Sequence, residues 1–406
     1  MTSENNLYVE KNKAEVSKNV PELRFQGFID AWEQRKLSDL MTFSNGINAP
    51  KENYGTGTKM ISVMDILNPL PIKYDNILNS VAVDKKIEDK NKVEKGDLIF
   101  VRSSEIVEEV GWAKAYKEDR YALYSGFAIR GKRISSYNAY FIELTLNYAN
   151  RKEVERRAGG STRFNVSQEI LNSLTVLTPL ISEQNQIDLF FTKIDNTIAL
   201  HQQKLSQLEL MKKGFLQQLF PENGEKVPKV RFSNFEDEWE LRKLKDIISS
   251  ELKGKAKAEM YGTASPYLET NFLNGGEVSY VDSPIDVDKD DVIILWDGSQ
   301  AGTVYHGFKG ALGSTLKSYS PKESGEYLYQ YLKLNQQVIY DSYRTPNIPH
   351  VIKTFTKEFN VHFTCYEEQD KVGSFLNQLD EAIDLYQSKV DKLKLLKKGF
   401  LQKIFI

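Results

Sequence analysis

The sequence has little of the residues and segments that mark secreted, disulfide-bonded or membrane-embedded proteins. Its 406 residues contain a single cysteine, Cys365, so no disulfide can form within the chain. No N-terminal stretch has the apolar core of a signal peptide or of a membrane span. These absences predict a cytoplasmic protein that folds in a reducing compartment.

Signatures of catalysis and of metal binding are also missing. Gly55-Thr56-Gly57-Thr58-Lys59 lacks the spacing of a phosphate loop. Asn68-Pro69-Leu70-Pro71 lacks the aromatic residue of the Asn-Pro-Pro-aromatic motif of amino-methyltransferases, and we assign it to a turn. The histidines are scattered and predict neither a metal site nor a catalytic triad, so we interpret them as structural or solvent-exposed: His201, His306, His350 and His362. The chain is therefore predicted to be a binding protein and not an enzyme.

An excess of positive charge is absent as well. The chain has 54 Lys and Arg against 56 Asp and Glu, a formal net charge of −2, whereas nucleic-acid binders are typically basic. DNA binding must then rest on local patches, or on a partner that completes the basic surface. With 40% hydrophobic residues the chain can bury a sizeable core and is expected to form two or three domains.

What the sequence does contain is an internal duplication. Twelve residues in positions 20–39, a tryptophan among them, recur 207 positions later, which exceeds chance. The first set is Val20, Pro21, Arg24, Phe25, Phe28, Asp30, Trp32, Glu33, Arg35, Lys36, Leu37 and Asp39. The second set is Val227, Pro228, Arg231, Phe232, Phe235, Asp237, Trp239, Glu240, Arg242, Lys243, Leu244 and Asp246. We interpret the two tryptophans as core anchors.

The match between the halves is uneven along their length. It is sparse in the interior, where Tyr54-Gly55-Thr56 recurs as Tyr261-Gly262-Thr263. It is dense again toward the end, and both halves close on Lys-Lys-Gly-Phe-Leu-Gln, at residues 212–217 and 397–402. The repeated edges indicate a shared frame, and the divergent interiors indicate two different contents.

A long amphipathic helix is predicted at the end of each half, because apolar residues recur there in steps of three and four. The seam residues are Ile187, Phe191, Ile194, Ile198, Leu205 and Leu208 in the first helix, and Val372, Leu376, Leu379, Ile383, Tyr386, Val390 and Leu393 in the second. The 38 residues from Glu183 to Phe220 would extend about 57 Å as a helix, longer than a globular core requires. We interpret the helices as spacers that can pair with each other. A bundle hairpin that only stabilises the fold, or a generic dimer zipper, is the alternative.

The globular segments are predicted to be of the α+β class. Runs such as Asp97–Val101 and Asp291–Leu295 are typical of strands, and the segment Asn138–Arg157 is predicted to be helical, with a stop at Gly159-Gly160. The expected divisions are a mobile tail at 1–18, globular domains at 19–182 and 223–366, and spacer helices at 183–222 and 367–406.

Together these residues resemble the specificity subunit of a type I restriction-modification system, and the resemblance covers the chain after its tail. It is carried by the Pro-x-x-Arg-Phe…Phe…Trp…Leu-x-Asp element at 21–40 and 228–247, and by the Glu-Gln helix that closes with Lys-Lys-Gly-Phe-Leu-Gln. The segment Phe308–Ser314 is also similar to one common in such domains, whereas the first copy has Tyr121–Gly126 in its place.

The resemblance implies two target-recognition domains separated by two long antiparallel coiled-coil helices, with a pseudo-two-fold internal repeat. It implies a non-catalytic reader of double-stranded DNA for host defence, with each domain reading one half of an asymmetric bipartite site. Two methyltransferase subunits would methylate adenine N6, and two restriction subunits would translocate and cleave DNA. This chain would bind no cofactor, and S-adenosylmethionine, ATP and Mg would sit on the partners.

Polar residues in loops and at strand ends are the candidate base readers, because such side chains can reach base edges. In the first domain they are Tyr54, Thr58, Lys59, Arg102, Ser103, Ser104, Ser161, Thr162 and Arg163. In the second they are Tyr261, Ser265, Trp296, Asp297, Ser299, Gln300, Lys317, Arg344, Thr345 and Asn347.

Two other functions are compatible with a duplicated chain. The first is a coiled-coil scaffold protein with two adaptor domains and no DNA binding. The second is a self-sufficient methyltransferase, which would need cofactor and catalytic motifs that the sequence does not show. Co-purification with a stoichiometric methyltransferase would distinguish the DNA reader from the scaffold.

Overall fold

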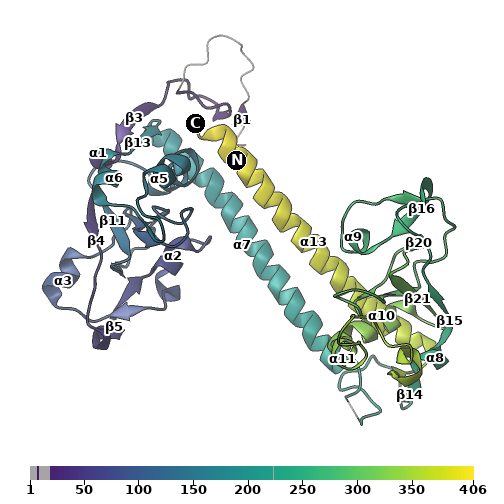
Figure 1. Ribbon diagram of the computed structural model, residues 1–406. Helices are drawn as coiled ribbons and strands as arrows, with labels where there is room; N and C mark the ends of the chain where they lie inside the picture. The colour runs from purple at the N-terminus through teal and green to yellow at the C-terminus, as the bar shows by residue number, and fades with distance from the viewer. Residues whose placement is uncertain (1–6, 9–18, 223) are drawn as a thin grey trace. The chain divides into compact units, whose positions relative to one another are not determined.

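The chain is described from a computed structural model that places residues 7–8, 19–222 and 224–406. It divides into two compact units: unit 1 comprises the chain up to His201 together with Lys389–Ile406, and unit 2 comprises Gln202–Ser388 (Figure 1). The predicted mobile tail, 1–18, lies outside the described residues except for β1 (Leu7–Tyr8), which pairs with β2 (Arg24–Phe25). Within the described ranges, no helix combines the length and the apolar character that a membrane span needs.

Unit 1 is built around a four-stranded antiparallel sheet whose central strand β7 is entirely buried. The strands are, in order, β4 (Met41–Asn45), β11 (Ala128–Arg133), β7 (Leu98–Val101) and β9 (Ala113–Ala115). A three-stranded sheet contains β10 (Leu123–Tyr124), β5 (Tyr54–Ile61) and β6 (Ser80–Val81). Two further pairs are β13 (Thr175–Thr178) with β3 (Glu33–Lys36), and β12 (Phe164–Asn165) with β8 (Ser103–Ser104).

Unit 2 repeats the four-stranded sheet, the three-stranded sheet and one of the strand pairs, so the duplication of the sequence is a duplication of the fold. Its four-stranded sheet has the order β15 (Ile248–Lys253), β21 (Leu316–Pro321), β18 (Val292–Leu295) and β19 (Val304–Tyr305). Its three-stranded sheet has β17 (Tyr280–Val281), β16 (Tyr261–Leu268) and β20 (Ala311–Leu312), and β14 (Glu240–Lys243) pairs with β22 (Asn360–Phe363). The strands predicted at 97–101 and 291–295 are β7 and β18.

Short helices cover these sheets. Unit 1 has α1 (Leu37–Leu40), α2 (Val63–Leu67), α3 (Lys85–Lys90), α4 (Ala139–Leu144), α5 (Arg151–Arg157) and α6 (Gln168–Ser173), with 3-10 turns at Lys51–Asn53 and Tyr74–Asn76. Unit 2 has α8 (Leu244–Ile247), α9 (Thr270–Leu273), α10 (Gly325–Leu334), α11 (Gln336–Ser342) and α12 (Phe355–Glu358). The predicted helix at 138–157 is α4 and α5 joined by a π-helical segment, Thr145–Ala149.

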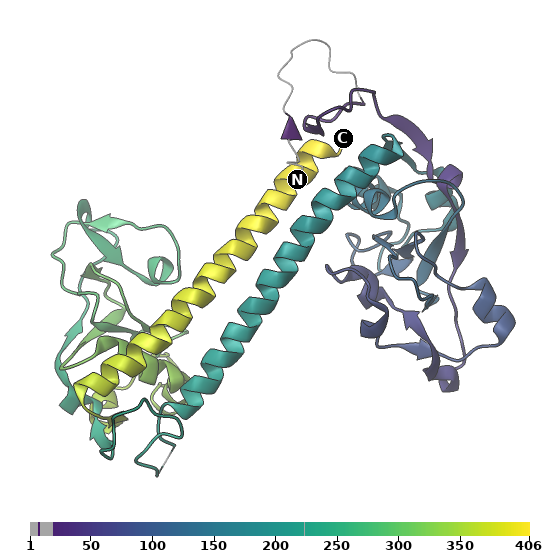
Figure 2. The ribbon, with the colours of Figure 1, turned by 180° about the vertical axis from the view of Figure 1, so that it is seen from behind.

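The two predicted spacer helices are α7 (Ile181–Gln218) and α13 (Tyr366–Ile404) (Figure 1). The prediction carried the first helix to Phe220, but it ends at Gln218 because Pro221 disfavours helical backbone in the residue before it. Every predicted seam residue is buried or partly buried. In unit 1 the first part of α7 meets the last part of α13, and in unit 2 the last part of α7 meets the first part of α13, so the pairing is antiparallel (Figures 1 and 2).

Equivalent residues make the helix-to-helix contacts in the two units. In unit 1, Lys397 of α13 forms an ion pair with Asp195 of α7 at 2.5 Å, and the rings of Phe400 and Phe190 meet edge-on with centroids 5.0 Å apart. In unit 2, Lys212 of α7 pairs with Asp380 of α13, and Phe215 meets Phe375 at 4.9 Å. These contacts form a pseudo-two-fold repeat.

Both tryptophans of the repeat are buried core anchors, as predicted. Trp32 packs against Phe141 and against Phe405 at the end of α13. Trp239 packs in the same way against Tyr327 and against Phe220, which follows α7. The core of each unit is thus completed by the end of the helix that belongs to the other half of the sequence.

A buried ion pair ties the start of each half to its own long helix. Arg24 donates two hydrogen bonds of 2.7 Å to Glu183, and Arg231 donates bonds of 2.7 and 2.9 Å to Glu368. Both glutamate side chains are only 1% exposed. Glu368 also accepts from Trp239 and Thr364, whereas Trp32 Nε1 has no partner within the described residues.

Removal of one partner from such a pair leaves a buried charge without compensation, which costs about 3 kcal/mol or more. We therefore expect Glu183→Gln to lower the free energy of unfolding by about 3 kcal/mol. The measurement is the urea midpoint of unfolding, followed by tryptophan fluorescence. Glu368→Gln should cost more, because Glu368 has two additional donors. Glu238→Gln is the control: Glu238 pairs with Lys226 at the surface, and its loss should leave the midpoint unchanged. Equal effects of all three changes would contradict this account.

Candidate nucleic-acid interface

The central strand of unit 1 ends at a small platform of polar residues. Strand β7 continues through Arg102 into β8, and a hairpin at 159–165 returns alongside it, with Asn165 opposite Ser103 and Phe164 opposite Ser104. Val166 N donates to Arg102 O at 3.0 Å and joins the two segments. The predicted readers Arg102–Ser104 and Ser161–Arg163, far apart in the sequence, are therefore neighbours in the fold.

The hairpin owes its shape to one glycine. Gly159 and Asn165 exchange two backbone hydrogen bonds of 3.0 and 2.8 Å, and the tip between them, 160–163, is exposed. Gly160 has a φ of +126°, and a Cβ there would lie 2.0 Å from the carbonyl oxygen of Arg163. Only glycine fits this position, so it fixes how Ser161, Thr162 and Arg163 are presented.

Unit 2 builds the same platform. Strand β18 continues through Trp296 into Asp297, which bridges to His350, while Arg344 bridges to Val351 across a second exposed loop. Arg344 donates to Ser299 O at 3.0 Å and so joins the 344–351 loop to the 296–300 loop. We call residues 102–104 with 159–165, and residues 296–300 with 344–351, the two recognition platforms.

The two platforms share a layout, a strand end paired with an exposed loop, but their side chains differ. In unit 1 the guanidinium of Arg163 lies 5.8 Å from the ring of Phe127, which is 54% exposed. In unit 2 Lys317 covers the ring of the buried Trp296 at 3.7 Å, and Lys253 pairs with Asp297 at 2.5 Å. The first platform therefore offers an arginine and an open aromatic ring, and the second offers a covered ring beside a charged pair.

Lys317 lies on β21 of the four-stranded sheet, and the remaining predicted readers lie on the three-stranded sheets, apart from the platforms. In unit 1 their polar groups have internal partners: Tyr54 accepts from Ala49 N, Thr58 donates to Glu88, and Lys59 donates to Ile77 O. In unit 2, Tyr261 is exposed, whereas Ser265 is buried and donates to Ser283 O.

The sequence-based reasoning passed over several platform residues. Phe127, Asn165, Lys253 and His350 belong to the platforms through the contacts above, and none was predicted. Asn165 and His350 follow the predicted loop readers Ser161–Arg163 and Arg344–Asn347 by two or three residues, and this spacing could have identified them. Phe127 and Lys253 carry no local signal, because strand pairing across long stretches of sequence brings them to the platforms.

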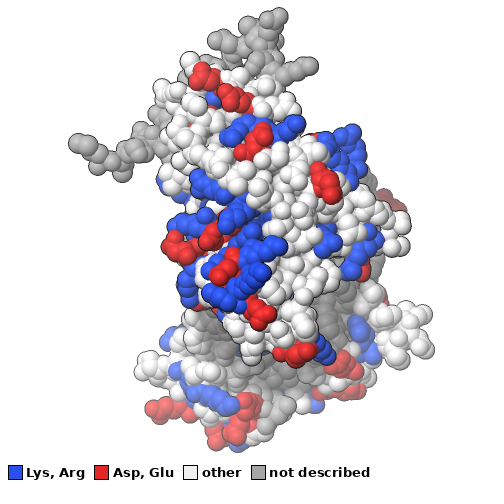
Figure 3. Space-filling view, turned by 90° about the vertical axis from the view of Figure 1, so that its left-hand side faces the viewer, with Lys and Arg blue, Asp and Glu red and all other residues white. Residues whose placement is uncertain are grey.

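Basic side chains are frequent on the side of unit 1 that Figure 3 shows, but acidic side chains lie among them. Ion pairs join lysines to aspartates in this unit: Lys92 with Asp89 at 2.7 Å, and Lys95 with Asp119 at 2.8 Å. The charge of these two lysines is thus neutralised locally.

In the part of the chain that the structure describes, no three His, Cys, Asp or Glu side chains are grouped so that they could hold a metal ion. Two histidines of the second unit have polar partners: His362 Nδ1 lies 3.0 Å from the hydroxyl of Tyr331, and His350 Nδ1 lies 3.0 Å from that of Thr345.

Two exposed platforms on one repeated frame define a class of protein with two units that share an architecture and differ in their surface side chains. The family model for the type I restriction modification DNA specificity domain matches residues 29–210 and again 236–395. The chain therefore belongs to the type I restriction-modification specificity family, and each half contains one of its domains.

Relatives support this membership. The chain is 31% identical over 180 residues to the type I restriction enzyme MjaVIII specificity subunit of Methanocaldococcus jannaschii, a match that spans 42% of each protein. It is 23% identical over 414 residues to a protein of the same organism named as the type I restriction enzyme MjaX specificity subunit, covering 91% of this chain and 92% of that one. The crystal structure of the type I restriction-modification S subunit from M. genitalium has the same fold, with a TM-score of 0.66 at 17% identity over 95% of this chain and 99% of that one.

Adjacent glycines provide a direct test of the hairpin. Gly160→Ala should open it, because the new methyl group meets Arg163 O and the backbone has a positive φ. Hydrogen–deuterium exchange should then become faster at the amides of Gly159 and Asn165. Gly159→Ala is the control, since a Cβ at Gly159 has nothing within 4 Å. Equal exchange in both variants would show that the hairpin does not depend on Gly160.

Proposed function

We propose that this chain is the DNA-recognition subunit of a type I restriction-modification complex, in which each platform reads one half of an asymmetric bipartite site. One observation carries the proposal: the two units present a strand end paired with an exposed loop at the same place in the same frame, but with different side chains. A surface that occurs twice with different side chains suits a target with two different halves.

The chemistry of the platforms suits base edges. Arginine can make two hydrogen bonds to guanine, and Asn or Gln can do so with adenine in the major groove. The side chains of these types are Arg102, Arg163 and Asn165 on the first platform and Gln300, Arg344 and Asn347 on the second. Phe127 adds an apolar surface that suits the methyl group of thymine. Base reading would need no more than these few residues on each side.

The long helices would fix the separation of the two half-sites. Half-sites read from one side of B-DNA are favoured about 34–36 Å apart, one helical turn of the duplex. A helix of 38 residues is a spacer of the same order, about 57 Å at 1.5 Å per residue. The unread spacer between the half-sites would then be set by helix length, because a helix does not stretch.

Partners would supply the chemistry. We infer that two methyltransferase subunits dock on this chain and methylate adenine N6 with S-adenosylmethionine, and that two restriction subunits cleave DNA with ATP and Mg. This chain itself would bind no cofactor and catalyse no step. Its net charge of −2 suits such a division, because the partners would provide much of the surface that contacts phosphates.

Exposed apolar residues on the helices suggest where those partners dock. Three pairs recur in both halves, each side chain between 41% and 71% exposed: Leu200 with Leu385, Leu210 with Leu395, and Met211 with Leu396. Leu200 and Met211 are 11 residues apart, about three helical turns, so they share a face, and that face is opposite the seam residue Ile198. Exposed leucines that recur in both halves favour two equivalent docking surfaces.

An exchange of domains tests the recognition proposal. Replacement of residues 41–182 by the same segment of another specificity subunit should change one half of the methylated site and leave the other half intact. Replacement of 248–366 should change the opposite half. The measurement is a genome-wide map of methylated adenines in a host that supplies the methyltransferase. A change in both halves, or in neither, would contradict the modular reading.

Charge placed on the docking surface of one unit tests the partner proposal. Leu200→Asp with Leu395→Asp alters unit 1 only, and each change should forfeit about 1.5–3 kcal/mol of apolar burial. Native mass spectrometry should then find one methyltransferase subunit for each chain in place of two. Ile29→Asp is the control, because Ile29 is also exposed but its counterpart in the repeat is the polar Glu236. Two bound subunits in the double variant would rule out this surface.

A further inference from the structure

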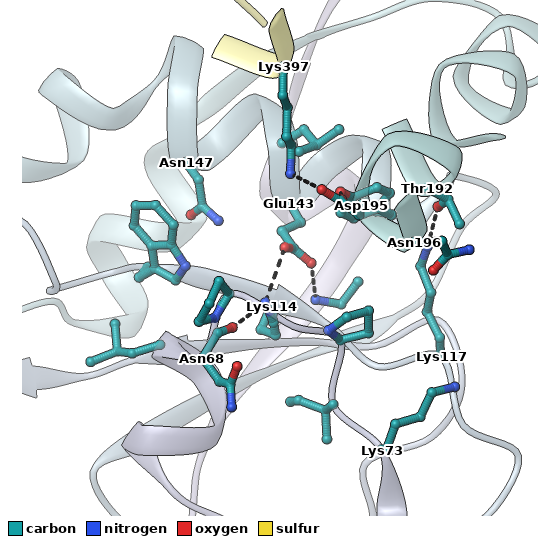
Figure 4. A pocket seen from close by; sticks show the side chains of 18 of the residues that line it. Asn68, Lys73, Lys114, Lys117, Glu143, Asn147, Thr192, Asp195, Asn196 and Lys397 are labelled. Atoms are coloured by element: carbon teal, nitrogen blue, oxygen red, sulfur yellow. Dashed lines mark hydrogen bonds and ion pairs between the residues drawn. The ribbon is translucent and has the colours of Figure 1, made fainter. Parts of the chain in front are cut away.

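A cavity of about 350 Å³ lies inside unit 1, between the first globular domain and the helix frame (Figure 4). Its walls are the 67–73 loop, strand β9, helix α4, the π-helical segment and helix α7, and Lys397 of α13 closes one side. Aromatic and proline side chains supply flat apolar surface: Pro69, Pro71, Trp112 and Tyr148. Ligand sites in proteins have this size and this mainly apolar lining.

A buried lysine with unused hydrogen-bonding capacity faces this cavity. The side chain of Lys114 is 6% exposed, and its Nζ donates to Asn68 O at 2.7 Å. The carboxylate of Glu143 lies 3.8 Å from Nζ, which is too far for a hydrogen bond. Since an ammonium group has three N–H donors, two of them have no acceptor among the described residues.

Glu143 cannot swing toward Lys114, because it is held by the sheet. Its Oε2 accepts from Ala115 N at 2.7 Å, and Asn147, one helical turn further on, exchanges two hydrogen bonds of 2.8 Å with Ala113. Glu143 and Asn147 thus provide hydrogen-bond partners for backbone groups of Ala113 and Ala115 on strand β9. Burial lowers the pKa of Lys114 and raises that of Glu143, because removal from water disfavours the charged form of each side chain.

The second copy fills the same place with rings. Ile99 lies opposite Lys114 in the sheet, and its counterpart Ile293 lies opposite Tyr305, so Lys114 corresponds to Tyr305 and Ala115 to His306. The N-cap residues Asn138 and Ser324 align α4 with α10, and Glu143 then corresponds to Tyr329.

Two of these residues stack in unit 2, where the rings of His306 and Tyr329 lie 5.6 Å apart at 20°. The fold therefore does not require Lys114 and Glu143 at this place.

We propose that the cavity of unit 1 binds a small organic anion with a flat apolar body, most simply an aromatic carboxylate. Lys114 donates to the acidic group, and Trp112 and the two prolines pack against the body. Lys114 is the lysine left to hold an anion, because Lys73, Lys117 and Lys397 already form ion pairs with Glu118, Asp188 and Asp195, whereas Glu143 lies beyond hydrogen-bond distance of Lys114. The buried charge in this copy is retained for the ligand and not for the fold.

The test uses the full chain with 2-naphthoate and its neutral analogue 2-naphthalenemethanol as probes. Calorimetry should show 2-naphthoate binding at least tenfold more tightly than the alcohol. Fluorescence of Trp112 should change on binding, because the other tryptophans, Trp32, Trp239 and Trp296, are buried elsewhere. Trp112→Phe should remove the fluorescence change while calorimetric binding persists.

Paired variants separate a ligand site from a structural ion pair. Lys114→Met with Glu143→Gln removes both charges and keeps an oxygen to accept from Ala115 N. We expect it to bind 2-naphthoate at least tenfold more weakly, with a Tm no lower than that of the natural chain. Lys333→Met is the control, since Lys333 is an exposed lysine on α10 of unit 2 whose loss should leave probe binding unchanged.

Three results would overturn the proposal: no binding of the anion, equal binding of anion and alcohol, or a double variant that loses stability or fails to fold. The last result would mean that the pair serves the fold. None of these outcomes bears on DNA recognition, because the inference does not rest on the proposed function.

Discussion

The pairing of each long helix with the end of the other is the interaction on which both units depend. Trp32 contacts Phe405, which comes from the far end of the chain, and Trp239 contacts Phe220, which follows α7. Each tryptophan core therefore includes a ring from the other half of the sequence. Leu23 N and Val230 N donate to Lys403 O and Gln218 O at 3.0 Å, so even the first strand segments are anchored on the other helix. Neither half can fold fully from its own residues, and this explains why the helices and edges repeat so closely.

That dependence leaves the interiors free to differ. The frame requires the Arg–Glu pairs, the phenylalanine contacts and the tryptophan cores, all of which recur in both units. It does not require a particular side chain on an exposed hairpin tip, since such a side chain packs against little. It also accepts either rings or a charged cavity between the globular domain and the helices. A binding surface can therefore change while the energy that holds the unit together stays the same.

Much of the fold, and a smaller part of the candidate site, followed from the sequence. The buried strands β7 and β18 and the helical seam were predictable because local periodicity reflects burial. The predicted spacer helix 183–222 extends past Gln218, where α7 ends, because Pro221 disfavours helical backbone in the residue before it and apolar periodicity does not report this effect. Thr58 and Ser265 were chosen as exposed loop residues, yet both donate to partners within their own unit, Glu88 and Ser283. Their partners lie 30 and 18 residues away, and sequence spacing does not reveal such contacts.

The sequence by itself determined the duplication, the two long helices, the core role of the tryptophans and the division into a repeated frame and divergent interiors. Each of these depends on patterns within one segment or on identity between two segments. Only the tertiary structure decided that Arg102–Ser104 meets Ser161–Arg163, that Phe127 lies beneath Arg163, and that Lys114 faces a cavity while Tyr305 occupies its counterpart. These juxtapositions arise from strand pairing and packing between distant segments, and their energies depend on neighbours that no local pattern specifies.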